Sequence, residues 1–147
     1  MKKDLKLNKE VVYLDTNLFV FAVLENGKAK EILKKLAKGT IKAVTSVITW
    51  DEFVWAMKKT TSDYDFAKKE GKRFLFLPNL TLADLNFDIV KKAQDLIENY
   101  NLKPRDSLHI ATAISKGINK IISDDSDLDN IKEVKRISIN EFQLIFY

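Results

Sequence analysis

Apolar positions along this chain fall into short continuous runs and into longer segments with helical spacing. The short runs, rich in aliphatic and β-branched residues, predict five strands at 11–14, 41–45, 80–85, 120–123 and 134–139. Segments whose apolar residues recur every three or four positions predict helices at 17–24, 28–38, 47–59, 63–74, 87–100 and 104–114, with a last helical turn towards 147.

Helix-start signals support these boundaries. Ser46, Ser62 and Asn86 can cap the helices that follow them, and Pro104 is favoured at a first helical position. Because strands alternate with helices throughout, we expect one α/β domain spanning 1–147. It should have three layers, α/β/α, around a mostly parallel sheet of four to five strands.

Acidic residues stand where the predicted strands end. Asp15 directly follows the first strand, and Asp124 and Asp125 follow the fourth. Glu52 lies early in the helix after the second strand, and Asp106 lies in the first turn of a buried helix. Ligands of open α/β sheets bind outside the carboxyl ends of strands, so these segments can bring their carboxylates to one crevice.

Such a cluster favours a bound divalent cation, because close carboxylates repel one another unless a positive charge lies between them. The chain has no Cys and a single His, His109, which argues against a zinc site of the usual kind. Oxygen ligands favour Mg²⁺ or Mn²⁺. A site made of carboxylates suits metal-assisted hydrolysis of phosphodiesters.

Each acid also has a purely structural explanation. Asp15 can end its strand as a turn residue, with Thr16 and Asn17 capping the next helix. Glu52 stands three residues after Thr49, so the pair can form a capping box.

The remaining polar candidates are open to the same alternative. Asp106 can serve the helix dipole, and 123–127 has an ordinary turn composition. His109 is expected to be a structural group, and Lys103 and Arg105 are equally consistent with phosphate contacts or a solvated helix start.

Composition and charge add little about partners. Apolar residues make up 46% and charged residues 31%, as in a folded protein, and the net charge of +4 is compatible with nucleic acid. We expect most of Trp50, Trp55, Tyr64 and Phe66 to pack in the core. The apolar runs are too short to span a membrane, and residues 1–6 lack the apolar core of a signal peptide, so we expect a cytoplasmic protein.

Four segments, taken together and in order, resemble PIN-domain ribonucleases. They are VYLDTN at 12–17, TS at 45–46 followed by DEF at 51–53, PRDSLHIATA at 104–113, and IISDDSDLD at 121–129. In the last segment Leu128 stands where the family usually has an aromatic residue. The compact length is most similar to the VapC toxins of prokaryotic, in particular archaeal, toxin–antitoxin pairs.

The resemblance implies an endoribonuclease that depends on Mg²⁺ or Mn²⁺, forms a homodimer and is held inactive by a cognate antitoxin. It carries the acidic cluster onto Asp15, Glu52, Asp106 and Asp125. Asp15 and Asp106 would be the most direct metal ligands. Glu52 and Asp125 would complete the metal site, bind a second ion or orient the attacking water.

Supporting positions follow from the same resemblance. Thr16, Asn17 and Ser123 match polar positions near the family's site and would help to orient the ligands. Asp124 and Asp127 are alternatives to Asp125, because a shift of register within the turn would exchange their roles.

Two other classes of function stay open. One is a phosphatase or phosphotransferase with Asp15 as nucleophile, although such enzymes commonly have an acid two residues later and position 17 is Asn. The other is a non-catalytic module that binds RNA or a protein partner.

Overall fold

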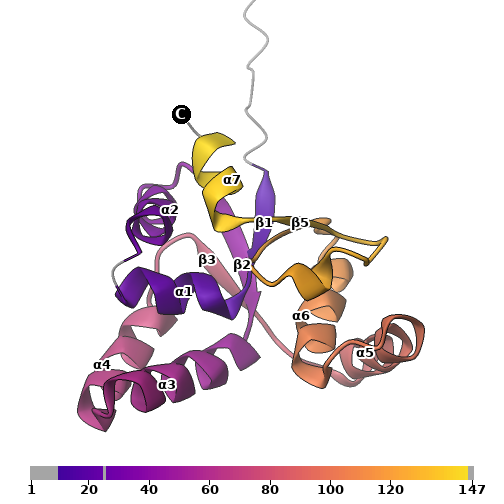
Figure 1. The fold of residues 1–147 in the computed structure, drawn as a ribbon, viewed down its shortest axis with the longest axis horizontal. Coiled ribbons are helices and arrows are strands. Elements are labelled where there is room, and N and C mark those ends of the chain that lie inside the picture. The colour runs from indigo at the N-terminus through magenta and orange to yellow at the C-terminus, as the bar shows by residue number, and fades with distance from the viewer. Residues whose placement is uncertain (1–9, 25, 146–147) are drawn as a thin grey trace, which may run out of the picture.

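A parallel five-stranded sheet separates two groups of helices, as the computed structural model shows (Figure 1). The structure describes residues 10–24 and 26–145, so the basic stretch 1–6 lies outside it. The strands are β1 (Val11–Leu14), β2 (Lys42–Ser46), β3 (Leu80–Ala83), β4 (Lys120–Ile122) and β5 (Lys135–Ile137). The helices are α1 (Thr16–Val23), α2 (Gly27–Ala37), α3 (Ile48–Thr61), α4 (Tyr64–Leu75), α5 (Phe87–Tyr100), α6 (Pro104–Ser115) and α7 (Ile139–Ile145), with a 3₁₀ turn η1 (Ser126–Leu128).

The strand order β3-β2-β1-β4-β5 puts β1 at the centre, and every neighbouring pair is parallel. The chain first builds outward from β1 to β3 and then returns through α5 and α6 to start β4 on the other side of β1. The two halves of the sheet thus diverge between β1 and β4. Such a switch point opens a crevice at the carboxyl ends of the two strands, where Asp15 and Ser123 follow.

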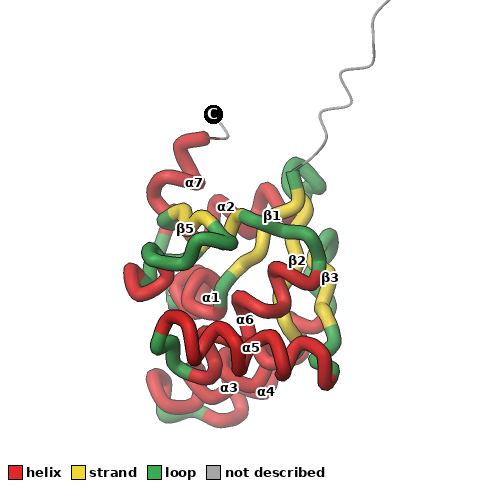
Figure 2. Tube along the Cα trace, turned by 90° about the vertical axis from the view of Figure 1, so that its right-hand side faces the viewer, coloured by secondary structure: helices red, strands yellow, loops and turns green. Residues whose placement is uncertain are grey.

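Strand alternation sends side chains into two separate cores. Val12 and Leu14 pack with the cluster that includes residues of α1 to α4 and α7, whereas Tyr13 packs with residues of α5 and α6. The two groups of helices lie on opposite sides of the strands in Figure 1, and Figure 2 shows the same chain from the side of α5 and α6. The expected three-layer α/β/α fold is therefore confirmed.

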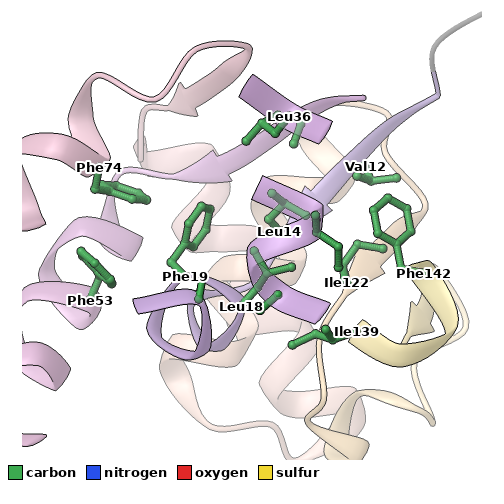
Figure 3. Close-up of a cluster of buried hydrophobic side chains, with 14 of the residues drawn as sticks. Val12, Leu14, Leu18, Phe19, Leu36, Phe53, Phe74, Ile122, Ile139 and Phe142 are labelled. Atoms are coloured by element: carbon green, nitrogen blue, oxygen red, sulfur yellow. The ribbon is translucent and has the colours of Figure 1, made fainter. Parts of the chain in front are cut away.

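Aromatic side chains fill the first core between α1, α3 and α4. The Phe74 ring meets Phe19 edge-on at 5.0 Å between centroids and lies 5.5 Å from the Phe53 ring (Figure 3). Among the helices of the described segments, none has the length and hydrophobicity needed to cross a bilayer.

Helix starts depend on local side-chain acceptors, and one prediction about them is wrong. Asn86 caps α5 as expected, its side chain accepting from the Ile89 N–H. Ser62 does not cap α4: it ends α3 in a left-handed conformation, and Asp63 caps α4 by accepting from Phe66.

The start of α3 also bears on Glu52. This helix begins at Ile48, whose N–H donates to the Ser46 hydroxyl, so Thr49 is already helical. The Thr49 hydroxyl lies 2.7 Å from that of Thr45. The capping-box explanation for Glu52 is therefore wrong.

Gly71 marks the closest approach of α4 to α3. A Cβ atom there would lie 2.7 Å from Val54 Cγ2 and 3.3 Å from Trp50 Nε1. We expect Gly71→Ala to lower the free energy of unfolding by about 1 kcal/mol, because overpacking costs about 1–3 kcal/mol and exceeds the ~1 kcal/mol that alanine gains in helix propensity. Urea unfolding followed by circular dichroism measures this change.

Gly27→Ala is the matched control, since Gly27 is also helical but has open space around its Cβ position. Its unfolding midpoint should stay equal to that of the wild type or rise. Equal stabilities of Gly71→Ala and Gly27→Ala would contradict the steric role of Gly71.

Candidate active site

Four acidic side chains from four separate elements line one hollow at the carboxyl edge of the sheet. They are Asp15, Glu52, Asp106 and Asp125. The hollow has a volume of about 350 Å³, and its other lining residues are Thr16, Asn17, Val20, Trp55, Ala56 and Arg105. The structure thus brings together carboxylates that are up to 110 positions apart in the chain.

Asp15 is held rigidly at the junction of β1 and α1. It is only 7% exposed, and its backbone N–H donates to the Ile122 carbonyl at 3.1 Å, which continues the pairing of β1 with β4. Its Oδ1 atom accepts from the Thr16 N–H at 2.8 Å, and Oδ2 accepts from the buried Ser123 hydroxyl at 2.7 Å. Ser123 Oγ also accepts from the Asp125 N–H at 3.1 Å, so one serine orients both segments.

Glu52 is positioned from inside the protein by a chain of hydrogen bonds. The Ser46 N–H donates to Tyr13 Oη at 3.0 Å, and Tyr13 Oη lies 2.5 Å from Nδ1 of the buried His109. The other ring nitrogen, Nε2, lies 2.5 Å from Glu52 Oε1, which also accepts from the Thr16 hydroxyl at 3.3 Å. His109 is therefore a hydrogen-bonded link between core and site, in line with the structural role expected for it.

Electrostatics reinforce this link. Burial lowers the pKa of His109, but the hydrogen bond to Glu52 and the charges of Asp15, Glu52 and Asp106 outweigh burial and raise that pKa above its ordinary value. Burial raises the pKa of Tyr13, so its hydroxyl stays neutral. The Glu52 carboxylate thus stabilises the charged form of the His109 imidazole.

Asp106 shows most directly that the acids are close together. It lies in the first turn of α6 and is partly buried. Burial, together with the negative charges of Asp125 and Asp15, raises the pKa of Asp106 to about 6. The charges of Asp15 and Asp125 therefore disfavour the ionised form of Asp106.

The loop after β4 separates the roles of its acids. Asp125 lines the hollow and caps η1 by accepting from the Asp127 N–H at 3.0 Å. Asp124 instead accepts from the Ile139 N–H at 2.9 Å and so caps the start of α7. Asp127 is exposed and lines a neighbouring hollow with Asp106. This geometry favours Asp125 over its two neighbours as the fourth acid.

The acidic side chains of the hollow offer carboxylate oxygen atoms as ligands for a metal ion. Within residues 10–24 and 26–145, no three His, Cys, Asp or Glu side chains have the spacing of a complete metal site. The described part of the chain does contain one buried side-chain oxygen without a hydrogen-bond partner, Asn17 Oδ1, and Asn17 lines this hollow. Mutually repelling carboxyl groups beside an unused amide oxygen fit a hard divalent cation.

Two features of the site lie beyond what the sequence indicated. Tyr13 counts as an apolar strand residue in the sequence pattern, yet its hydroxyl joins Ser46 to His109. Most of the four residues Trp50, Trp55, Tyr64 and Phe66 were expected to pack in the core, but the first three are 43%, 59% and 50% exposed. Phe66 is partly buried and packs against the core.

Comparison with known proteins shows the family and the fold of this chain. The family model for the PIN domain matches residues 12–134. Ribonuclease VapC2 of Methanocaldococcus jannaschii is 25% identical over 146 residues, an alignment that covers 92% of this chain and 98% of the relative.

Two solved structures share the fold. A toxin–antitoxin complex from Klebsiella pneumoniae has a chain with a TM-score of 0.63 and 23% identity, covering 84% of this chain and 94% of that one. VapBC2 from Rickettsia felis, bound to a DNA fragment from its promoter, gives a TM-score of 0.69 and 19% identity, covering 87% and 98%. Because the family match extends over most of the sequence and includes β1 through η1, this chain belongs to the PIN domain family.

Proposed function

We propose that this chain is a metal-dependent endoribonuclease and the toxin of a VapBC-type toxin–antitoxin pair. The observation that carries the proposal is that Asp15, Glu52, Asp106 and Asp125 line one hollow, where burial and the charges of Asp125 and Asp15 raise the pKa of Asp106 to about 6. Membership of the PIN domain family and the similarity to a protein named Ribonuclease VapC2 support the same conclusion.

The cofactor that we propose is Mg²⁺ or Mn²⁺. Asp15, Asp106 and Asp125 would hold it with Glu52, and Asn17, which also lines this hollow, has a buried Oδ1 atom without a hydrogen-bond partner. When bound, such a cation supplies Lewis-acid chemistry: it lowers the pKa of a water and offsets charge on a phosphodiester oxygen.

Neighbouring residues orient the carboxylates of Asp15 and Glu52 through hydrogen bonds. Ser123 and the Thr16 N–H fix both oxygens of Asp15, and His109 fixes Oε1 of Glu52. Glu52 is then poised to accept a proton from the attacking water. Arg105 lines the same hollow, and its Nη2 atom lies 3.9 Å from Oδ2 of Asp51. Because this ion pair is exposed to solvent, the guanidinium group can exchange Asp51 for a phosphate of the substrate.

The partners that we propose are RNA, a cognate antitoxin and a second copy of this chain. The similar chain from Klebsiella pneumoniae comes from a toxin–antitoxin complex, which supports the antitoxin. The net charge of +4 is compatible with a polyanionic substrate.

Cleavage of a structured RNA by the purified protein tests the proposed reaction. We expect cutting with Mg²⁺ or Mn²⁺ and none with EDTA. Asp15→Asn and Asp106→Asn should each reduce the rate more than about 100-fold, beyond the ~10–100-fold typical of residues that merely support a metal ligand. Asp95→Asn, an exposed acid of α5 outside the hollow, is the matched control and should cut normally. Full activity of a well-folded Asp106→Asn protein would refute the assignment.

The loop acids give a second test. Asp125→Asn should abolish cleavage, whereas Asp127→Asn should retain most of it, because Asp127 does not line the hollow of the four acids. Asp124→Ala should lower the unfolding midpoint, because it removes the acceptor of the Ile139 N–H at the start of α7, a loss that typically costs ~1 kcal/mol. If Asp127→Asn abolished cleavage while Asp125→Asn did not, the register of the loop would have to be reassigned.

Stability against pH tests the carboxylate crowding without any catalysis. The pKa of Asp106 rises from 3.8 to about 6 on folding, so the native state binds more protons than the unfolded state between these values. In EDTA, the wild type should therefore lose stability as the pH rises from about 4 to about 6, relative to Asp106→Asn, and the difference should stay constant above that range.

Urea midpoints measured from pH 4 to 8 give this difference directly. Asp95→Asn should follow the wild type at every pH. Adding Mg²⁺ at pH 7 should raise the midpoint of the wild type more than that of Asp106→Asn, because the ion binds the native site. Parallel curves for Asp106→Asn and the wild type would show that folding does not raise the pKa of Asp106.

A further inference from the structure

A large aromatic side chain stands in solvent at the edge of the acidic hollow. Trp55 is 59% exposed and lines the hollow together with Arg105 and Asp106. It follows Glu52 by three residues on α3, so the two side chains project from the same face of this helix. An exposed tryptophan beside a catalytic hollow provides a flat apolar surface where a substrate must pass.

Basic and aromatic side chains continue outward from Trp55. Lys58 Nζ lies 5.9 Å from the centroid of the Trp55 ring and 4.5 Å from that of Tyr64, which is itself 50% exposed. Lys68 Nζ lies 4.7 Å from the Tyr64 ring and 3.7 Å from Asp65. We call Trp55, Lys58, Tyr64 and Lys68 the aromatic–basic strip.

The chemistry of this strip matches that of an unpaired nucleic-acid strand, in which flat bases alternate with anionic phosphates. Aromatic rings stack on bases of any sequence, and lysines neutralise phosphates. A second copy of the chain is a poorer fit to the same surface. A symmetric contact there would bring Lys58 and Lys68 of both copies together in a protein whose net charge is already +4.

We propose that the aromatic–basic strip binds single-stranded RNA next to the cleavage site. Trp55 stacks on a base beside the scissile phosphate, and Lys58 and Lys68 contact phosphates further along the strand. This inference rests on the proposed ribonuclease function, and it assigns Trp55 a role in positioning the substrate. Bases inside a duplex are unavailable for stacking, so the strip favours loops and unpaired segments.

Binding of a fluorescein-labelled, mixed-sequence RNA of ten nucleotides, measured by anisotropy in EDTA, isolates this role from cleavage. Trp55→Ala should weaken binding about 5- to 100-fold, as expected for loss of one stacked base, whereas Trp55→Phe should keep most of the affinity. Lys58→Ala should weaken binding and reduce the slope of log affinity against log salt by about one. The same sequence as a duplex should bind less tightly to the wild type.

Phe87 on α5 offers a matched control. It is 74% exposed and has Lys91 Nζ 5.2 Å from its ring centroid, but it does not line the acidic hollow. Phe87→Ala should bind the RNA within about twofold of the wild type. An equal loss for Phe87→Ala and Trp55→Ala would overturn the proposal, because the effect would then be one of exposed aromatic residues in general.

Cleavage kinetics with Mg²⁺ on unpaired RNA separate positioning from folding. Trp55→Ala should raise KM while the unfolding midpoint stays unchanged, and Trp55→Phe should restore KM. If the wild type cleaves and Trp55→Ala binds and cleaves equally well, the inference is wrong while the proposed function stands. If the wild type binds RNA through Trp55 but never cleaves, the proposed function fails and the strip survives as a binding surface.

Sedimentation of the RNA-free proteins tests whether a second copy of the chain, rather than RNA, covers the aromatic–basic strip. The wild type and Trp55→Ala should show the same mass. Conversion of a wild-type dimer into monomers by Trp55→Ala would assign this face to a second copy of the chain and overturn the inference.

Discussion

Repulsion between carboxyl groups is the constraint around which the site of this protein is built. Asp15, Asp106 and Asp125 come from three segments that meet where the sheet diverges, and burial together with the charges of the other two acids raises the pKa of Asp106. The surrounding structure resists this repulsion with neutral donors: the Thr16 N–H and the Ser123 hydroxyl both donate to Asp15. These donors thus hold Asp15 in place beside the other acids, an arrangement that would favour the divalent cation proposed above.

The two cores of the fold contribute to the site in different ways. Leu14 anchors β1 against α1, which fixes the turn that carries Asp15. Tyr13, one residue earlier, points to the other face of the sheet and reaches His109 on α6. Through His109 the second core holds Glu52, although this residue belongs to α3 on the opposite side. Both faces of β1 therefore help to position acidic side chains: one face fixes the turn of Asp15, and the other holds Glu52 through His109.

Local signals explain what the sequence could predict. The starts of α5 at Asn86 and of α6 at Pro104 are correct because each depends on one residue and its immediate neighbours. Ser62 misleads because it is next to Asp63, which is an equally suitable cap: Ser62 ends α3 in a left-handed conformation and Asp63 caps α4. Strand order depends on contacts between segments that are distant in the sequence. The exposure of Trp55 is also not predictable, because helical spacing marks an apolar face without showing which element covers it. The choice of Asp125 over Asp124 needed the contact of Asp124 with Ile139, which lies 15 positions away.

That contact of Asp124 has a practical consequence for handling the protein. It fastens the first residue of α7 to the loop that carries Asp125, while Asn140 accepts a hydrogen bond from Lys28 of α2. Because Asp124 directly precedes Asp125, the start of α7 is connected to the loop that lines the acidic hollow. An affinity tag, fluorescent protein or surface tether joined beyond α7 would place a mechanical load on the hydrogen bond between Ile139 and Asp124. Such attachments call for a flexible Gly/Ser spacer, or activity will change without any substitution near the site.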